Sequence, residues 1–516
     1  MNQAGSRRWW ALLAITLAVL AVTLDVTVLT VALPTLAGAL RASESQLQWF
    51  VTAYTLALVA GMLPAGLLGD RYGRRAVMAA ALVLFAVGSV GCAYAPSPAV
   101  FTAARVVLGL SGATLIVLAL SIVTALFDEA ERPRAVGLWG AANFVGLPLG
   151  PILGGWILTN AWWGWIFLMN VPVALLGLVA LLALVPESRA SRAPGIDVPG
   201  VLLSGAGLVA LMYGVVQAGD SGWGSVSAVI PALAGVVVLA GFAAWERRVS
   251  RRPGGEPLVD LSLFGSRSFT WGVILTAFGV FGLFGVLFAL PQFFQAVMGV
   301  DPQGSGFRLL PVIAGLILGA VPADRIAARI GARLTVAAGF AIVAAGLAIG
   351  TTTRAGSGDA FLAAWTFITG AGAGLGFATA ASAALVELPA ERSGVGSALL
   401  QAVVKLGPAF GSSILGSVLN STYQHGVSVT GLPSAAAAVA RGSVFGGIAV
   451  ARELGSAALL VSARTAFAAG MDDAVRAAAV VAVAAAVLAL AFLPARAHAA
   501  EPGPAPRPEA GDAAAG

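Results

Sequence analysis

The chain consists of long apolar runs that alternate with short segments rich in charged, glycine or proline residues. Each run is long enough for a helix across the hydrocarbon core of a bilayer, which takes about 20 residues. The pattern therefore predicts an all-α polytopic membrane protein with fourteen transmembrane spans. The predicted spans are 10–34, 48–69, 76–94, 99–126, 134–158, 163–185, 199–217, 226–245, 269–298, 305–323, 333–352, 360–386, 394–420 and 475–494.

Composition and charge agree with this pattern. Hydrophobic residues make up 59%, charged residues 10%, and the mean hydropathy is +0.93, whereas an average soluble domain has about 25% charged residues. If the N-terminus is cytoplasmic, the cytoplasmic loops and tails hold 20 lysines and arginines and the outer loops hold 7, while Arg105 and Lys405 lie inside spans. This bias follows the positive-inside rule, so we expect both termini in the cytoplasm.

Several classes of function lack the residues that they need. Cys92 is the only cysteine, and His425 and His498 are the only histidines, so we expect no metal site. The one lysine, Lys405, precedes Leu406, whereas a nucleotide-binding loop needs a lysine before Ser or Thr. The net charge of +6 follows from the loop bias and does not indicate nucleic-acid binding. We expect no enzyme and no cofactor, and any transport would be driven by a gradient.

A charged loop separates the second and third spans. Residues 66–75 read Gly-Leu-Leu-Gly-Asp-Arg-Tyr-Gly-Arg-Arg. Residues 328–333, Ala-Arg-Ile-Gly-Ala-Arg, are a degraded second copy, with Ala328 where the first copy has Asp70. Internal repeats are typical of transporters built from two related bundles. The candidate gating-loop residues are Gly66, Gly69, Asp70, Arg71, Gly73, Arg74 and Arg75.

Several motifs together carry a family resemblance over nearly the whole chain. The charged loop resembles the one between the second and third helices of the major facilitator superfamily, and residues 146–155 resemble its antiporter motif. Four further segments are similar to the fourteen-span drug:proton antiporters of that superfamily. They are 24–34, Trp49 with 52–54, 165–172 and 290–295, the last continuing to Pro311. The chain departs from the family pattern at Leu108, Thr30 and Gly164.

The resemblance implies two six-helix bundles and two additional helices. The N-terminal bundle would be 1–186, a linker with the two additional spans 187–265, and the C-terminal bundle 266–495, with a long outer loop at 421–474. The tail, 496–516, is rich in Pro, Ala and Gly and is expected to be a disordered cytoplasmic segment. The implied location is the bacterial cytoplasmic membrane. The implied partners are the lipid bilayer, a small-molecule substrate and protons, and we expect a monomer without nucleic acid.

Asp70 is the candidate gate within the charged loop. Acids contribute little to topology, so we expect Asp70 to pair with cytoplasmic arginines or a helix N-terminus when the transporter faces outward. For Arg74 and Arg75 the positive-inside rule is a sufficient alternative explanation.

The antiporter-like motif gives the fifth span a bare face. Glycines at every fourth position allow a neighbouring helix to approach closely, and two prolines remove backbone donors and bend the helix. Helix packing alone would explain this face, but we favour packing that also acts as a hinge. The motif residues are Gly146, Pro148, Gly150, Pro151, Gly154 and Gly155.

Three ionisable residues lie well inside predicted spans, where such residues are functional candidates for proton coupling or cavity charge. Asp25 and Arg105 lie at comparable depths in the first and fourth spans, both of which line the cavity in the family, so the resemblance permits an ion pair. Asp25 is then either a proton carrier or a fixed charge. Lys405 lies near mid-membrane in the thirteenth span. It would bind an anionic substrate, carry the proton or only counter Asp25, and we prefer a cavity-facing functional role.

An aromatic stripe follows one face of the ninth span. It consists of Phe281, Phe284 and Phe288, with Gln292 one turn later. Such a stripe more often faces lipid or packs in a core. A wall of the substrate cavity is the alternative interpretation.

Together these observations lead to a proton-coupled efflux transporter that exports amphipathic small molecules such as drugs and antibiotics. An exporter of an endogenous metabolite is the main alternative, and proton-coupled uptake is less favoured because of the antiporter-like fifth span. A receptor or scaffold would need no mid-membrane Asp25 and Lys405. One acid and two bases within spans make neutral and anionic substrates worth testing beside cations.

Overall fold

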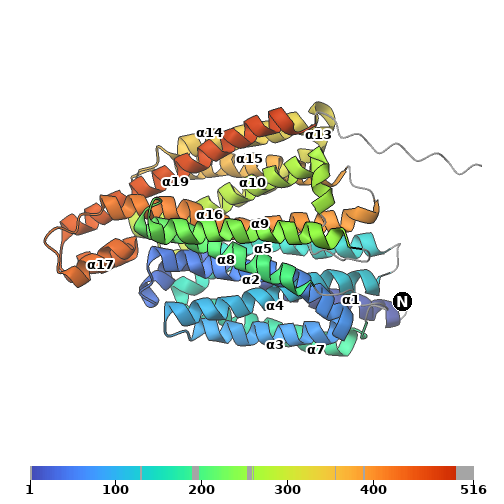
Figure 1. Cartoon of the computed structure of the whole chain (residues 1–516). Coiled ribbons are helices and arrows are strands. Elements are labelled where there is room, and N and C mark those ends of the chain that lie inside the picture. The colour runs from blue at the N-terminus through green and yellow to red at the C-terminus, as the bar shows by residue number, and fades with distance from the viewer. Residues whose placement is uncertain are drawn as a thin grey trace, which may run out of the picture.

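The computed structural model describes residues 3–127, 131–188, 197–252, 259, 261–354, 356–386 and 390–494. Within these ranges the regular secondary structure is helical, without a β-strand. The long helices run between the two ends of the molecule. α1 begins and α19 ends at the same end, opposite the tip that carries α17 (Figure 1). The all-α polytopic fold is confirmed, and this arrangement agrees with termini on one side of the membrane.

The helix bounds follow the apolar runs of the sequence. The helices are α1 (Gln3–Ala39), α2 (Glu44–Tyr72), α3 (Arg74–Ala93), α4 (Pro98–Leu126), α5 (Arg132–Asn160), α6 (Trp165–Leu168), α7 (Asn170–Leu184), α8 (Val198–Ser221), α9 (Val226–Ser250), η1 (Leu261–Gly265), α10 (Arg267–Gln292), η2 (Phe293–Val297), α11 (Pro302–Arg308), α12 (Leu310–Ala320), α13 (Ala323–Ile330), α14 (Ala332–Gly350), α15 (Asp359–Val386), α16 (Ala390–Gly426), α17 (Ser434–Gly442), α18 (Val444–Glu453) and α19 (Ala457–Phe492).

The number of spans comes close to the predicted fourteen without establishing it. Among the described residues, 12 helices are long and apolar enough to cross a membrane. α2 is a thirteenth when its parts, Glu44–Met62 and Pro64–Tyr72, count as one span bent by 46°, a bend that the missing N–H of the proline explains. The remaining predicted span, 134–158, coincides with α5, whose side chains at 136–145 lie outside the described part.

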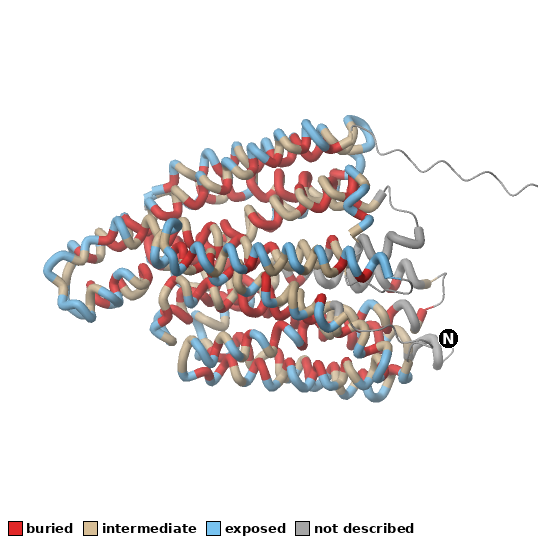
Figure 2. The backbone as a smooth tube through the Cα atoms, in the orientation of Figure 1, coloured by how far each residue is buried: buried red, intermediate tan, exposed pale blue. Residues whose placement is uncertain are grey.

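The helices form two bundles. In the first, α1 packs on α5 and α7, and α4 packs on α2 and α3. In the second, α15 packs on α12 and α14, and α16 packs on α10 and α19. The first bundle fills the lower part of Figure 1 and most of the second the upper part. Buried positions line the inner helix faces in Figure 2. Outer faces carry exposed apolar side chains such as Val87, Leu176, Val237 and Val480, as expected for contact with lipid.

The two additional helices, α8 and α9, pack on each other, and α8 lies against both α2 and α16. Polar contacts hold α8 to α16. Ser417 Oγ donates to a carbonyl oxygen of α8 at 2.9 Å, and Asn420 Nδ2 donates to Asp220 Oδ1 at 2.9 Å. Toward α2, the ring centroids of Trp49 and Tyr213 are 6.4 Å apart. Asp220 is also hydrogen-bonded to Ser45 of α2, so α8 has polar contacts with both bundles.

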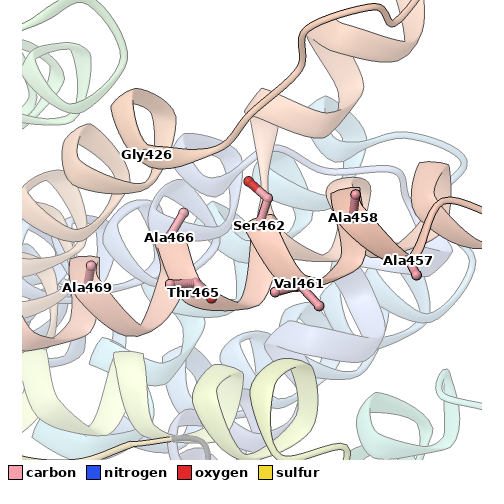
Figure 3. A pocket seen from close by; sticks show the side chains of 8 residues that line it. All are labelled: Gly426, Ala457, Ala458, Val461, Ser462, Thr465, Ala466 and Ala469. Atoms are coloured by element: carbon pink, nitrogen blue, oxygen red, sulfur yellow. The ribbon is translucent and has the colours of Figure 1, made fainter.

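The outer segment 421–474 is largely helical, which corrects the prediction of a long loop. α16 continues to Gly426, α17 and α18 follow, and α19 begins at Ala457. Alanine is the strongest helix former, so Pro433 and the glycines separate short helices rather than unfolding the segment. A groove of about 720 Å³ lies along the first part of α19, and its lining contains no ionisable residue (Figure 3). It is lined by Gly426, Ala457, Ala458, Val461, Ser462, Thr465, Ala466 and Ala469.

Candidate functional site

Asp25 of α1 and Arg105 of α4 form an ion pair inside the first bundle. Arg105 Nη1 lies 2.5 Å from Asp25 Oδ2, and the side chains are 1% and 0% exposed, respectively. A lone charge at such a buried position would be costly, whereas each member of the pair offsets the charge of the other. The ion pair that the family resemblance permitted is therefore present.

Three further helices of the same bundle surround the pair. The guanidinium donates through Nε to Phe50 O at 3.1 Å and lies 4.1 Å from the ring centroid of Tyr54, both on α2. Asn170 Nδ2 of α7 lies 3.4 Å from the carboxylate Oδ1 and 3.4 Å from Ser89 Oγ of α3. Sequence reasoning assigned no role to these four residues, although Tyr54 and Asn170 belong to motifs that carried the resemblance.

Lys405 lies on α16 of the second bundle and is half-buried. Among the described residues it makes no ion pair. Asp25, the acid that it was considered to counter, is bound to Arg105. An ammonium group without a counter-ion in an apolar helix is a functional candidate by default, and its role is taken up below.

The charged loop is a tight connection between α2 and α3. Asp70 accepts from Arg74 Nη2 at 2.8 Å and from Nε at 3.1 Å, so its partner is an arginine of the same loop. Gly73 has a φ of 107° at the junction of the two helices, a conformation that favours glycine. The Arg71 guanidinium lies 5.6 Å from the ring centroid of Tyr72.

The first two glycines of the loop motif bring α2 close to α4. A Cβ on Gly69 would collide with the side chain of Leu118, and one on Gly66 would lie 3.5 Å from Val117. These glycines therefore contribute to packing inside the first bundle, while Asp70 and the arginines supply the charge at its cytoplasmic end.

Glu187, which sequence analysis missed, anchors the loop from outside the motif. Its carboxylate accepts the backbone N–H of Arg75 at 3.1 Å and of Ala76 at 3.2 Å. An acid at this position satisfies free N–H groups in the first turn of α3 and complements the helix dipole. Arg75 Nη2 in turn donates to Leu182 O at 2.8 Å. Glu187 lies 112 residues from Arg75 in the sequence, so no local sequence pattern indicated that the two residues are in contact.

The second bundle repeats the backbone of this loop. Gly331 has a φ of 85° between α13 and α14, as Gly73 has between α2 and α3. Arg333 then donates to Leu490 O of α19, the last long helix of its bundle. Ala328 occupies the position that corresponds to Asp70. The repeat predicted from sequence is therefore present in the backbone, while the second copy lacks the acid.

The glycines of α5 serve two different neighbours. A Cβ on Gly150 would collide with Thr27 of α1, and one on Gly154 would lie 2.8 Å from a Val28 methyl group. Gly146 likewise faces α1. Gly155 faces the other way, because a Cβ there would lie 2.7 Å from Pro302 O at the start of α11.

One of the two prolines of α5 belongs to the face that packs on α11. Pro148 and Pro151 are inside the helix, and a Cβ on Gly306 of α11 would collide with Pro151 O. α5 thus packs closely on its own bundle and on the opposite one, as a joint between bundles requires.

The bundles meet along the outer halves of their helices, at contacts that we call the outer seam. α2 begins at the outer side and its last turn contains Asp70, and α16 leads to the outer tip, so residues 44–52 and 413–417 are outer positions. Within the described part of the chain, these contacts join the two bundles at the outer side. The hydrogen bonds across the outer seam join Thr52 to Ser413, Gln48 to Ser417, Glu44 to Gln292, Val31 to Gln295 and Thr159 to Gln303.

The aromatic stripe of α10 is divided between core and seam. Phe281 is buried in the second bundle, and Phe284 is half-buried. Phe288 packs with the core of the first bundle, and Gln292 binds Glu44. Burial agrees with packing rather than lipid contact, and a part of these residues in a substrate cavity is a proposal.

The described residues contain no cluster of three or more His, Cys, Asp or Glu side chains placed to hold a metal ion. Among the described residues, the ionisable groups inside the helices include the buried pair Asp25–Arg105 and Lys405, which makes no ion pair there.

Comparisons with known proteins agree with this geometry. The chain matches the model of the Major Facilitator Superfamily over residues 15–412. It is 33% identical over 493 residues to the multidrug efflux pump LfrA of Mycolicibacterium smegmatis, which covers 94% of this chain and 97% of that protein. It is 34% identical over 391 residues to the multidrug resistance protein Stp of Mycobacterium tuberculosis, covering 75% and 71%. It is 31% identical over 416 residues to the tetracenomycin C resistance and export protein of Streptomyces glaucescens, covering 80% and 76%.

Two solved structures share the fold. One is a bacterial homolog of the human lysosomal transporter Spinster in an inward-facing, unoccupied conformation, with a TM-score of 0.69 and 19% identity over 97% of this chain and 100% of that chain. The other is a D-xylose-proton symporter, with a TM-score of 0.60 and 18% identity over 94% and 98%. At these identities the likeness concerns the fold alone.

Proposed function

Because the chain belongs to the major facilitator superfamily, we propose that it is a proton-coupled efflux transporter that exports amphipathic small molecules such as drugs and antibiotics. It is a multi-pass protein of the cytoplasmic membrane. Relatives named as multidrug resistance and efflux proteins support export as the direction of transport. Proton coupling, the absence of catalysis and function as a monomer are parts of the proposal.

The packing of α5 is the observation that carries this proposal. One glycine face of α5 lies on α1 within its bundle, and Gly155 and Pro151 lie on α11 of the other bundle. A helix that is tightly packed on both bundles must transmit or release strain when they rock. Its sequence resembles the antiporter motif, which links this joint to exchange rather than uptake.

The proposed cycle begins from an arrangement closed on the outer side. Substrate enters from the cytoplasm, the bundles rock until the outer seam opens, and substrate leaves. The protein then returns with a proton on Asp25 or on another buried group such as Lys405. Substrate and proton compete for one conformation, which is sufficient for antiport.

Asp70 is proposed as the cytoplasmic gate of this cycle. In the outer-closed arrangement its partner is Arg74 of its own loop. When the cytoplasmic side closes, Asp70 exchanges this partner for a cation or helix N-terminus of the second bundle. Full transport by Asp70→Asn with normal expression would exclude this role.

Lys405 distinguishes between substrate classes. Within the described part of the chain it has no counter-ion, so an anionic or neutral hydrogen-bonding substrate fits beside it more readily than a dication. Export of a metabolite made by the cell is the second candidate function. The name of the tetracenomycin C relative, which joins resistance and export, favours including natural products in the test.

The test is energised efflux from a drug-hypersensitive bacterium that expresses the chain. A panel of cationic, neutral and anionic compounds is measured with and without a protonophore. Protonophore-sensitive efflux that Asp25→Asn abolishes supports the proposal. Efflux that persists without a proton gradient, or that Asp25→Asn leaves intact, contradicts proton coupling through Asp25, and no efflux of any compound favours the metabolite exporter.

A further inference from the structure

A buried acid lies in the outer seam and belongs to none of the motifs described above. Glu44 is the first residue of α2 and is 2% exposed. Gln292 of α10, which is 0% exposed, donates through Nε2 to Glu44 Oε1 at 3.1 Å. One partner belongs to each bundle, so this contact exists only while the outer seam is closed.

The surroundings of Glu44 supply no positive charge within the described part of the chain. The titratable groups that face it are Asp220 of α8 and Tyr423 of α16. Asp220 is itself an acid, and the Tyr423 hydroxyl donates to a backbone carbonyl of α17 at 2.6 Å. Arg41, between α1 and α2, and Arg441 of α17 are exposed and form no ion pair with Glu44.

The protonation state of this carboxyl group is therefore tied to the seam. A buried carboxylate with a neutral amide donor and a neighbouring acid is strongly disfavoured, whereas the neutral acid can share a hydrogen bond with the amide. When the seam opens, Glu44 and Gln292 separate and external water hydrates the carboxylate. The closed seam prefers Glu44 with a proton, and the open seam prefers it without one.

We propose that Glu44 is a proton-binding site that controls closure of the outer seam. Closure takes up one proton from the external solution onto the Glu44 carboxylate, and opening returns that proton to the same solution. Because the site exchanges protons with the outer side only, it does not carry the transported proton. External acid instead shifts the empty transporter toward its outer-closed form.

Distances across the outer seam test this inference without a substrate. In a Cys92→Ala background, spin labels on cysteines at Ala99 and Gly358, exposed positions at the outer ends of α4 and α15, report the open and closed populations by pulsed electron resonance. The full-length protein is measured in lipid nanodiscs between about pH 5 and pH 9. One linked proton changes the open-to-closed ratio by about tenfold per pH unit near the midpoint.

Three variants test whether the Glu44 carboxyl group causes the pH dependence. Glu44→Gln, which stays neutral, is expected to remain closed with less than about a twofold change over this range. Glu44→Asp keeps a titratable group and retains the pH dependence. Glu453 is an exposed acid on α18 that makes no ion pair among the described residues, so Glu453→Gln is expected to behave like the wild type. Thermal unfolding of each variant verifies that it is folded.

Two results would overturn the inference: a pH dependence that Glu44→Gln retains, or one that a folded Glu44→Asp loses. The inference would also be overturned if the open-to-closed ratio of the wild-type protein did not change with pH. The inference rests on the proposed alternation of the two bundles, but the distances are measured without substrate. Failure of the efflux assay and failure of this test are therefore separate outcomes.

Discussion

Arg75 and Arg333 hold equivalent places in the two bundles. Each lies two residues after a glycine with positive φ, and each donates to a carbonyl in the last turn of a long helix, at Leu182 O of α7 and Leu490 O of α19. A cation at the carboxyl end of a helix is favourable for its dipole. The two cytoplasmic loops are thus anchored in the same way, although only the first contains the Asp70–Arg74 pair.

Removal of either arginine is expected to weaken its own bundle. Arg75→Ala and Arg333→Ala should each lower the free energy of unfolding by about 1 kcal/mol, the size of one hydrogen bond. The effects should add, because the residues lie in separate bundles. Denaturant unfolding of the purified protein measures them. Arg325→Ala, an exposed position of α13, is the control and should be neutral. A double variant far from additivity would show that the loops are coupled.

Substitutions in the buried pair Asp25–Arg105 should lower the free energy of unfolding more than those of Arg75 and Arg333. Arg105→Gln leaves Asp25 without its cation and should cost about 3–5 kcal/mol, and Asp25→Asn should cost a similar amount. The double variant Asp25→Asn with Arg105→Gln buries no net charge, so it should be less destabilised than the sum of the two. Unfolding experiments on all three variants form the cycle. Simple additivity would mean that the side chains do not interact.

Substitution of Lys405, unlike substitution of Asp25 or Arg105, should not destabilise the protein. Lys405→Gln removes a half-buried charge that has no ion pair in the described part of the chain, so it should leave stability unchanged or raise it. Export of anionic compounds should fall by at least about tenfold, which corresponds to 1.4 kcal/mol of lost interaction. Efflux of a charge-matched panel measures this. An equal loss for cationic and anionic compounds would argue against a substrate contact.

Substitutions on the two faces of α5 should have different effects on the outer seam. Gly150→Ala collides with Thr27 within the first bundle, and Gly155→Ala collides with the start of α11. Each overpacked contact should cost about 1–3 kcal/mol, but only Gly155→Ala should also open the outer seam, as measured with the spin-label pair.

A glycine of α9 provides the matched control for these variants. Gly241 has open space around it, so Gly241→Ala should leave transport and the seam unchanged. Identical populations of open and closed forms in Gly150→Ala and Gly155→Ala would contradict the assignment of the second face to the joint.

The fold was predictable because the bilayer sets the length of every span and the charges between spans set their direction. The comparable depths of Asp25 and Arg105 likewise followed from counting along two helices. The repeat of the charged loop was visible because glycine is required at the positive φ of Gly73 and Gly331.

Other parts of the site depend on contacts that no local pattern encodes. Glu187 reaches the first turn of α3 from 112 residues away, and Glu44 becomes buried only because a second bundle closes over it. Both acids lie just outside apolar runs, where an acid is ordinarily solvated. The short helices after Gly426 were missed because proline and glycine suggested a loop, while alanine between them favoured helix.

The contacts of α8 have a consequence for the surrounding lipid. Hydrocarbon tails that entered between α2 and α16 would meet buried polar groups such as Gln48 and Ser417, which tails cannot hydrogen-bond. α8 lies against both helices, is hydrogen-bonded to α16 and has polar and aromatic contacts with α2, so it covers these polar groups from the lipid side. The inserted helix pair is therefore placed to keep lipid tails away from the polar contacts between α2 and α16.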